Sequence, residues 1–472
     1  MRALLLLLAT WLAGTVWAGA LPPEIDAALA AARLPRDAVT LVVADVDPAL
    51  PPLLAHRAQA QVSPASIAKL GTTLAALDLL GPAFTWRTPV LADGPVVGGI
   101  LQGNLYIRGQ GDPKLVLERL WLLLRRLRAQ GIERVAGDIV LDHGAFQVPA
   151  ADPGAFDGEP LRPYNAGPDA LLLNYKSVVL GFVPQPGGTA RVVADPPLAD
   201  VQWPPAVPLS EGDCGDWRGG LRADFADPLR PRFAGAYPAS CGERSWPLAF
   251  ADPPSYAARA VAGLWQEIGG RIGGVVRDGT TPPAAVQLAE TESPPLAEVV
   301  RDINKYSNNV MAQQLFLTLG LQLRGAGTRE AARDVLGTWW RERISPDVPA
   351  FDNGSGLSRD MRMTGQQLTR LLQYGWSSPV MPELLASLPV VGADGTLRTT
   401  RAGAGAHLKS GSLREVWGVA GYVDGAHGHR YVLVAIANHP NATPQPVPGT
   451  GQRTTGMRGV VEALLAWVAS QP

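Results

Sequence analysis

The stretch Ser63-Pro64-Ala65-Ser66-Ile67-Ala68-Lys69 is the part of the chain from which its fold and chemistry can be interpreted. The residues after it, up to Leu80, carry leucines at helical spacing, and Gly81-Pro82 ends the run. On the first turn of such a helix, residues i and i+3 share a face, so the Ser66 hydroxyl can meet the Lys69 amine. The helix N-terminus also offers a backbone N–H group to a developing oxyanion. Alone, the same pattern also fits an N-cap serine ahead of an exposed lysine. The choice between a helix cap and a catalytic pair therefore depends on the other motifs in the chain.

The composition predicts a large folded protein of two or three domains. The chain has 472 residues, of which 46% are hydrophobic and 18% charged, enough for substantial cores. Its formal net charge of −1 gives no electrostatic basis for binding nucleic acid or an anionic membrane. In an oxidising compartment Cys214 and Cys241 most simply form one disulfide, and two buried free thiols are the alternative.

The first twenty residues have the pattern of a secretory signal peptide. Met1-Arg2 precedes an apolar run, and small residues follow it up to Ala18-Gly19-Ala20, an A-x-A cleavage site. The run is too short to span a membrane and Leu21-Pro22-Pro23 breaks it, although a retained anchor is the alternative. With no cysteine near the cleavage site to make a lipoprotein, we expect a periplasmic protein of a Gram-negative type of envelope, soluble or peripherally membrane-associated.

Hydrophobic patterns predict helices and a sheet at both ends of the mature chain and short strands in its middle. A strand hairpin at Val39–Val46 and Pro52–Arg57 precedes Ser66, and a three-strand meander follows His407. This arrangement indicates an α+β fold, an antiparallel sheet flanked by helices, interrupted by a long, mostly β, two-part insertion. The predicted segments are a signal peptide at 1–20, the main domain at 21–85 and 286–472, and the insertion with both cysteines at 86–285.

Lysine usage singles out a few positions. Among 41 basic residues only five are lysines, namely Lys69, Lys114, Lys176, Lys305 and Lys409. Arginine cannot release its proton in a protein, whereas a buried lysine can titrate near neutrality. A lysine retained in this background therefore indicates a role that arginine cannot fill.

Three short patterns combine serine, asparagine and lysine. They are Ser66-Ile67-Ala68-Lys69, then Ser307-Asn308-Asn309 in a break between two predicted helices, and Lys409-Ser410-Gly411-Ser412 on a predicted strand. Each alone is explained by a helix cap or a surface strand. The six histidines lack metal-ligand spacing, and no G-x-S-x-G elbow occurs. Together, in this order, the three patterns indicate a serine acyl-transfer site that needs no metal or cofactor.

This set resembles the penicillin-recognising serine enzymes, whose signatures are S-x-x-K, S-x-N and K-[ST]-G. The gaps of 241 residues from Ser66 to Ser307 and 102 from Ser307 to Lys409 are similar to those of the low-molecular-mass class C penicillin-binding proteins, the D-alanyl-D-alanine carboxypeptidase/endopeptidase family. Ser410 replaces a commoner threonine, and Gln313 stands where that family often has glutamate. Further matching segments extend the resemblance over nearly all of the mature chain: 111–113, 164–171, 352–359 and 392–398.

The resemblance implies a transpeptidase-like domain, as in serine β-lactamases, that cleaves peptidoglycan stem peptides through an acyl-serine. Ser66 would be the nucleophile and Lys69, its pKa lowered, the general base. Ser307 would relay a proton between Lys409 and the leaving amine, and Asn309 would orient Lys69 and bind the substrate amide. β-Lactam antibiotics would acylate the same serine.

The resemblance also implies how the substrate is bound. Lys409 and Ser410 would hold its terminal carboxylate, and the backbone N–H groups of Ser66 and Ser412 would hold the oxyanion. Asp157 or Glu159 would meet the amino group of a diaminopimelate side chain, although an exposed acidic loop explains them equally well. A serine β-lactamase or esterase of the same fold, and a non-catalytic peptidoglycan-binding sensor, are the competing functions, and the sequence leaves a homodimer open.

Overall fold

The computed structural model describes residues 21–150, 152–401, 405–446 and 453–471, so the predicted signal peptide lies outside the described residues. The described chain forms two compact units. The first contains the residues up to Ile67, then Arg362–Ser378 and those from Leu388 onward, and the second contains Ala68–Met361 and Pro379–Ser387. Ser66 therefore belongs to the first unit and Lys69 to the second.

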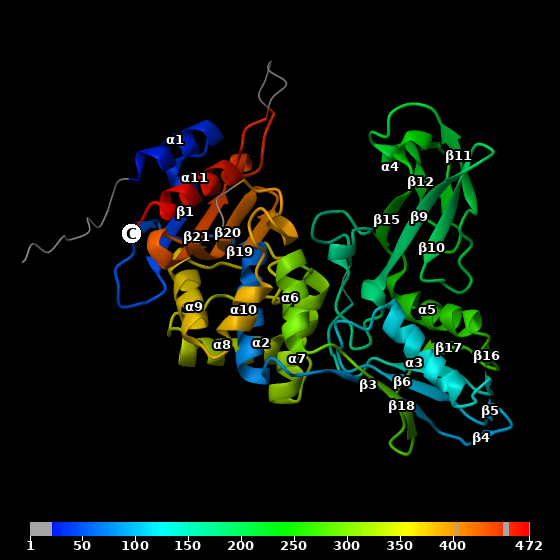
Figure 1. The fold of residues 1–472 in the computed structure, drawn as a ribbon. Coiled ribbons are helices and arrows are strands. Elements are labelled where there is room, and N and C mark those ends of the chain that lie inside the picture. Colours follow the sequence, from blue (N-terminus) through cyan, green and yellow to red (C-terminus); the bar gives the residue numbers. More distant parts are fainter. Residues whose placement is uncertain (1–20, 151, 402–404, 447–452, 472) are drawn as a thin grey trace, which may run out of the picture. The chain divides into compact units, whose positions relative to one another are not determined.

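The first unit is built on a five-stranded antiparallel sheet in the order β19-β20-β21-β1-β2 (Figure 1). The hairpin and the meander predicted from the sequence are both confirmed, and β1 pairs with β21 along its whole length to join them. The edge of the sheet is β19, which carries the third motif. The strands are β1 (Val39–Asp45), β2 (Leu54–His56), β19 (Ala406–Leu413), β20 (Val416–Asp424) and β21 (Arg430–Asn438).

Helices cover both faces of this sheet, with α1 (Pro23–Ala32) and α11 (Met457–Ala469) on one side and α9 (Gly365–Ser377) on the other (Figure 1). Alternate strand residues face each layer, because successive side chains of a strand point to opposite sides. Leu408 joins the core under α1 and α11. The Tyr422 hydroxyl on the opposite face donates a hydrogen bond to the Leu372 carbonyl of α9 at 2.8 Å.

The second unit contains a helical part in which α2 contacts the other four helices. Its helices are α2 (Lys69–Leu80), α6 (Leu296–Tyr306), α7 (Asn309–Arg324), α8 (Arg329–Arg343) and α10 (Met381–Ser387). The prediction that Ser66 lies on the first turn of an α-helix is wrong, because it lies in the 3-10 turn Ala65–Ala68 and the α-helix begins at Lys69. The predicted end is confirmed, since Gly81 caps α2.

The remainder of the second unit is rich in short strands, as predicted. Its sheets have the orders β17-β8-β6-β3-β18, β16-β7-β5-β4, β14-β11-β10-β9-β15 and β12-β13. One shared core packs these strands against α3 (Leu117–Ala129) and α5 (Pro253–Glu267). Neighbouring strands can belong to different sheets, since β5 (Ile100–Leu101) and β6 (Leu105–Arg108) do not share one. The boundaries at 86 and 285 remain predictions.

The strands of this part are otherwise β3 (Arg87–Ala92), β4 (Val96–Val97), β7 (Arg134–Val135), β8 (Ile139–Asp142), β9 (Ser177–Gln185), β10 (Thr189–Asp195), β11 (Ala206–Ser210), β12 (Ala223–Asp224), β13 (Arg232–Phe233), β14 (Tyr237–Pro238), β15 (Arg244–Ala249), β16 (Arg271–Ile272), β17 (Val276–Asp278) and β18 (Val286–Glu292). The short helix α4 (Trp217–Gly220) lies among them. The disulfide between Cys214 and Cys241 is present. Over the described ranges, no helix has the length and apolar character needed to cross a membrane.

Candidate active site

Lys69 is fully buried at the start of α2, with its amine held by two oxygen acceptors. The Nζ atom donates to Asn309 Oδ1 at 2.6 Å and to the backbone carbonyl of Ser355 at 2.6 Å. The structure thus brings together two of the residues that the sequence singled out, from α2 and α7. Ser355 was assigned no role from the sequence. An amine fixed in this way is suited to proton transfer, because its position is set by groups that do not titrate.

The break between α6 and α7 explains why the second motif also looks like a helix cap. Ser307 ends α6 in the left-handed conformation with φ of 57°, which costs a non-glycine residue about 1–2 kcal/mol. Asn308 then caps α7 by accepting a hydrogen bond from the Met311 N–H at 3.0 Å. Asn309 is the first residue of α7. Its Nδ2 donates to the Tyr164 carbonyl at 3.2 Å, and its Oδ1 accepts the hydrogen bond from Lys69. The helix-cap interpretation of this motif is therefore confirmed, and Asn309 in addition contacts Lys69.

In the first unit the turn that carries Ser66 is anchored to the sheet. The side chain of Asn438, at the end of β21, bonds both backbone groups of Ser63: it accepts from the N–H at 2.7 Å and donates to the carbonyl at 3.2 Å. Ala65, directly before Ser66, has φ of 48°, a conformation that favours glycine. Ser66 thus follows a strained and doubly anchored segment, which fixes the direction in which the chain enters α2.

The edge strand β19 runs very close to this turn at Gly411. A Cβ atom at position 411 would lie 2.7 Å from the Pro64 carbonyl oxygen and 3.2 Å from the Ile67 nitrogen. Contacts this short are not available to a side chain, so only glycine lets the two backbones approach. This close approach explains why the third residue of the Lys409–Ser412 motif is a glycine.

Lys409 is buried on β19, and burial lowers its pKa to about 7. Its Nζ donates to the Ser410 carbonyl at 2.6 Å. The Ser410 hydroxyl in turn shares a hydrogen bond of 2.6 Å with the Thr396 hydroxyl. Thr396 belongs to the segment 392–398, which matches the family pattern but has no role predicted from the sequence. Ser412, at the end of the motif, is exposed.

The two predicted acidic residues differ in what their carboxylates contact. Asp157 accepts hydrogen bonds from the Tyr164 hydroxyl at 2.8 Å and from Asn165 Nδ2 at 2.7 Å. Slight burial raises the pKa of Asp157, but these two bonds outweigh it and the net shift is downward. Glu159 instead forms an exposed ion pair with Arg162 at 3.3 Å. Asp157 is linked to the second motif, because the carbonyl of its partner Tyr164 accepts from Asn309.

The arrangement supplies the parts of an acyl-transfer site. The second unit holds a buried amine with fixed acceptors, and the first unit holds a serine in an anchored turn and a second buried lysine. Serine acyl transfer uses groups of these kinds. The described ranges contain no group of three or more His, Cys, Asp or Glu residues that could hold a metal ion.

Comparison with known proteins identifies the family to which the chain is similar. Residues 21–453 match the family described as D-Ala-D-Ala carboxypeptidase 3 (S13). The chain is 26% identical over 388 residues to D-alanyl-D-alanine carboxypeptidase DacB of Haemophilus influenzae, covering 79% of this chain and 80% of that protein. It is 29% identical over 415 residues to D-alanyl-D-alanine carboxypeptidase of an Actinomadura species, covering 82% and 75%.

Solved structures confirm the fold. The crystal structure of penicillin-binding protein 4 from Haemophilus influenzae superposes with a TM-score of 0.76 at 21% identity, over 95% of this chain and 99% of that one. A second structure of that protein, complexed with a β-lactam, superposes with a TM-score of 0.72 at 21% identity.

Proposed function

Because the chain belongs to the D-Ala-D-Ala carboxypeptidase 3 (S13) family and is a serine hydrolase, we propose that its three motifs cleave the bond before a terminal D-Ala of peptidoglycan stem peptides. The same chemistry cleaves D-Ala cross-links, so the protein acts as a carboxypeptidase, as an endopeptidase or as both. The observation that carries the assignment of the base is the fully buried Lys69, whose amine is held by Asn309 and Ser355.

The reaction proceeds in two acyl transfers. Lys69 accepts the Ser66 proton as the hydroxyl attacks the D-Ala carbonyl, which forms the Ser66 ester through a tetrahedral intermediate. The peptide C–N bond breaks, and Ser307 passes a proton from Lys409 to the leaving amine of D-Ala. Lys69 releases the proton it took from Ser66 to solvent, Lys409 regains one from solvent, and both lysines return to their starting states. Water then attacks the ester with the same base, which releases the shortened peptide and restores Ser66. Ser66 and Lys69 are suited to this pairing because α2 continues directly from the turn that carries the serine.

Substrate binding is assigned to the third motif. Lys409 and Ser410 hold the terminal carboxylate, and the N–H groups of Ser66 and Ser412 hold the oxyanion. Both serines of the third motif lie on the edge strand beside the Ser66 turn, which supports this assignment. Asp157, or else Glu159, binds the free amine of the stem-peptide side chain. A β-lactam presents a carboxylate and a strained amide, so we expect it to acylate Ser66 as a substrate does.

The predicted signal peptide and the disulfide support action outside the cytoplasm. Residues 1–20 direct export in this proposal, and the disulfide between Cys214 and Cys241 suits an oxidising periplasm. Peptidoglycan lies in that compartment.

The decisive variant is Ser66→Ala. We expect the wild-type protein to release D-Ala from pentapeptide and monomers from cross-linked muropeptides, and the variant to lose both activities by about 1000-fold or more. Mass spectrometry of the wild type after exposure to penicillin should place a penicilloyl adduct on Ser66. Activity that survives in Ser66→Ala, with circular dichroism unchanged, would refute the mechanism. Rapid turnover of a chromogenic β-lactam without a stable adduct would instead indicate a β-lactamase.

A further inference from the structure

The loop after α8 carries a sequence motif that the proposed mechanism leaves unused. It reads Asp352-Asn353-Gly354-Ser355-Gly356-Leu357-Ser358-Arg359, and it lies wholly within the second unit. The loop is linked directly to Lys69 by the Ser355 carbonyl, which accepts from Lys69 Nζ at 2.6 Å. We propose that this loop is a fixed support for the base, with Asn353 as its positioning residue, a role that rests on the proposed function of Lys69.

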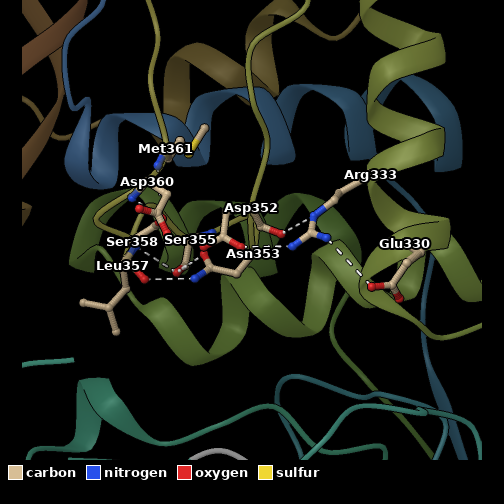
Figure 2. Close-up of polar contacts among 9 residues, drawn as sticks. All are labelled: Glu330, Arg333, Asp352, Asn353, Ser355, Leu357, Ser358, Asp360 and Met361. Atoms are coloured by element: carbon tan, nitrogen blue, oxygen red, sulfur yellow. Dashed lines mark hydrogen bonds and ion pairs between the residues drawn. The ribbon is translucent and has the colours of Figure 1, made fainter. Parts of the chain in front are cut away.

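Asn353 closes the loop on itself around Ser355 (Figure 2). Its Oδ1 accepts from the Ser355 N–H at 3.0 Å and from the Ser355 hydroxyl at 2.9 Å. Its Nδ2 donates to the Leu357 carbonyl at 2.9 Å, and the Ser355 hydroxyl accepts from the Leu357 N–H at 3.2 Å. Ser355 is fully buried, so these bonds are shielded from water and set the orientation of its carbonyl.

Three helices hold this closed loop from outside. From α8, Arg333 donates to the carbonyl and to the carboxylate of Asp352, both at 3.0 Å (Figure 2). From α2, the Thr72 hydroxyl donates to the Gly354 carbonyl at 2.8 Å. Gly354 has φ of 74°, and a Cβ there would lie 2.5 Å from Cβ of Phe316 on α7. The loop is thus held by a hydrogen bond from α2 and by close packing against α7, the helices that carry Lys69 and Asn309.

The chemistry of an amine explains why two acceptors are useful. A neutral lysine has two N–H groups and one lone pair, and it must point the lone pair at the proton it removes. Asn309 and Ser355 each accept one of the N–H groups, and these two hydrogen bonds restrict how the amine can be oriented. A backbone carbonyl neither titrates nor changes rotamer, so its support persists at any pH. Loss of Asn353 would free this carbonyl and slow the proton transfer without altering how a ligand first binds.

The test is the acylation of the full chain by a β-lactam, separated into a non-covalent dissociation constant and an acylation rate constant. For Asn353→Ala we expect the rate constant to fall about 10- to 100-fold and the dissociation constant to stay within about twofold of wild type. Asn353→Asp keeps an oxygen acceptor for Ser355 and should recover most of the rate. If Asn353→Asp is as slow as Asn353→Ala, or if Asn353→Ala acylates normally, the proposal is overturned.

Ser358→Ala is the matched control, because the Ser358 hydroxyl accepts from the Asp360 N–H at 3.1 Å and the Met361 N–H at 3.2 Å in the same loop. It should lower thermal stability comparably and leave the acylation rate constant unchanged. An equal loss of rate in Ser358→Ala would show that general loosening of the loop, and not the support of Ser355, matters. Ser66→Ala separates the two proposals. If this variant still forms the β-lactam adduct, the proposed function is refuted. If Ser66→Ala forms no adduct while Asn353→Ala is acylated at the normal rate, only the role of the loop is refuted.

Discussion

At the scale of single residues, the two buried lysines have different surroundings. Lys69 donates to a side-chain amide and a backbone carbonyl from two other segments of its unit, whereas Lys409 donates to the carbonyl of its own neighbour Ser410. Burial lowers the pKa of Lys409 to about 7, so close to neutrality both of its protonation states are populated. Arginine would remain charged at either position, which explains why lysine is retained in a chain so rich in arginine.

Lys409→Met should make the protein more stable and inactive. Because the pKa of Lys409 is lowered from 10.5 to about 7, the unfolded chain binds more protons between these values, and the stability contributed by this group rises with pH. Below pH 7 the folded state bears the full cost of the buried charge. Methionine removes that cost, so we expect denaturant unfolding at pH 7 to show a gain on the order of 2–4 kcal/mol.

Acylation by penicillin should fall in Lys409→Met by about 100-fold or more, since the carboxylate loses its cation. The gain in stability should shrink when the unfolding is repeated near pH 9.5, because the folded-state lysine is then neutral and the cost that remains is that of removing its proton one pH unit below the ordinary pKa of 10.5. A gain that is equal at both pH values, or a variant less stable than wild type, would contradict a destabilising charge at Lys409.

At the scale of elements, an edge strand of the first unit passes close to the turn that carries Ser66. β19 has a neighbour in the sheet on one side only, and at Gly411 it lies against the turn that carries Ser66. An edge strand leaves backbone donors unpaired, which is the condition for an oxyanion contact from Ser412. The glycine therefore matters for the separation of two backbones and not for flexibility.

Gly411→Ala should separate the strand from the turn. Its Cβ would lie 2.7 Å from the Pro64 oxygen, so the strand has to move by several tenths of an ångström. We expect the acylation rate to fall about 100-fold, because displacement of about 1 Å in an active site has that effect. Gly181→Ala is the control, since a Cβ in that strand would meet only Val193 at 3.8 Å. Normal acylation in Gly411→Ala would show that the close approach is unimportant.

At the scale of the whole molecule, the sequence predicts those helices, strands and turns that depend on local residue patterns. The end of α2, the hairpin and the meander follow from periodicity and turn residues. The predicted position of Ser66 in the first turn of α2 is wrong. Ala65, directly before it, adopts a positive φ that the residue pattern does not predict. Ser355 could not be assigned a role, since it acts through a carbonyl that every residue has. Its contact with Lys69 joins residues 286 positions apart.

The role of Asp157 tests how the insertion contributes to specificity. We expect Asp157→Asn to lower kcat/KM about 10- to 100-fold for a stem peptide with a free side-chain amine, because a charged hydrogen bond contributes about 1.5–3 kcal/mol. The same peptide with an acetylated amine should be cleaved equally by wild type and variant. The ratio of the two rates, measured by release of D-Ala, isolates the charge from any change in the loop.

Glu159→Gln is the matched control for Asp157→Asn. Both residues were candidates from the sequence, but only Asp157 is bonded to Tyr164, whose carbonyl accepts from Asn309. Glu159 pairs with Arg162 in an exposed position, where an ion pair contributes about 1 kcal/mol or less. Glu159→Gln should therefore preserve the preference for the free amine. If it abolishes that preference while Asp157→Asn keeps it, the amine contact belongs to Glu159; if both variants keep it, the insertion recognises the peptide through other groups.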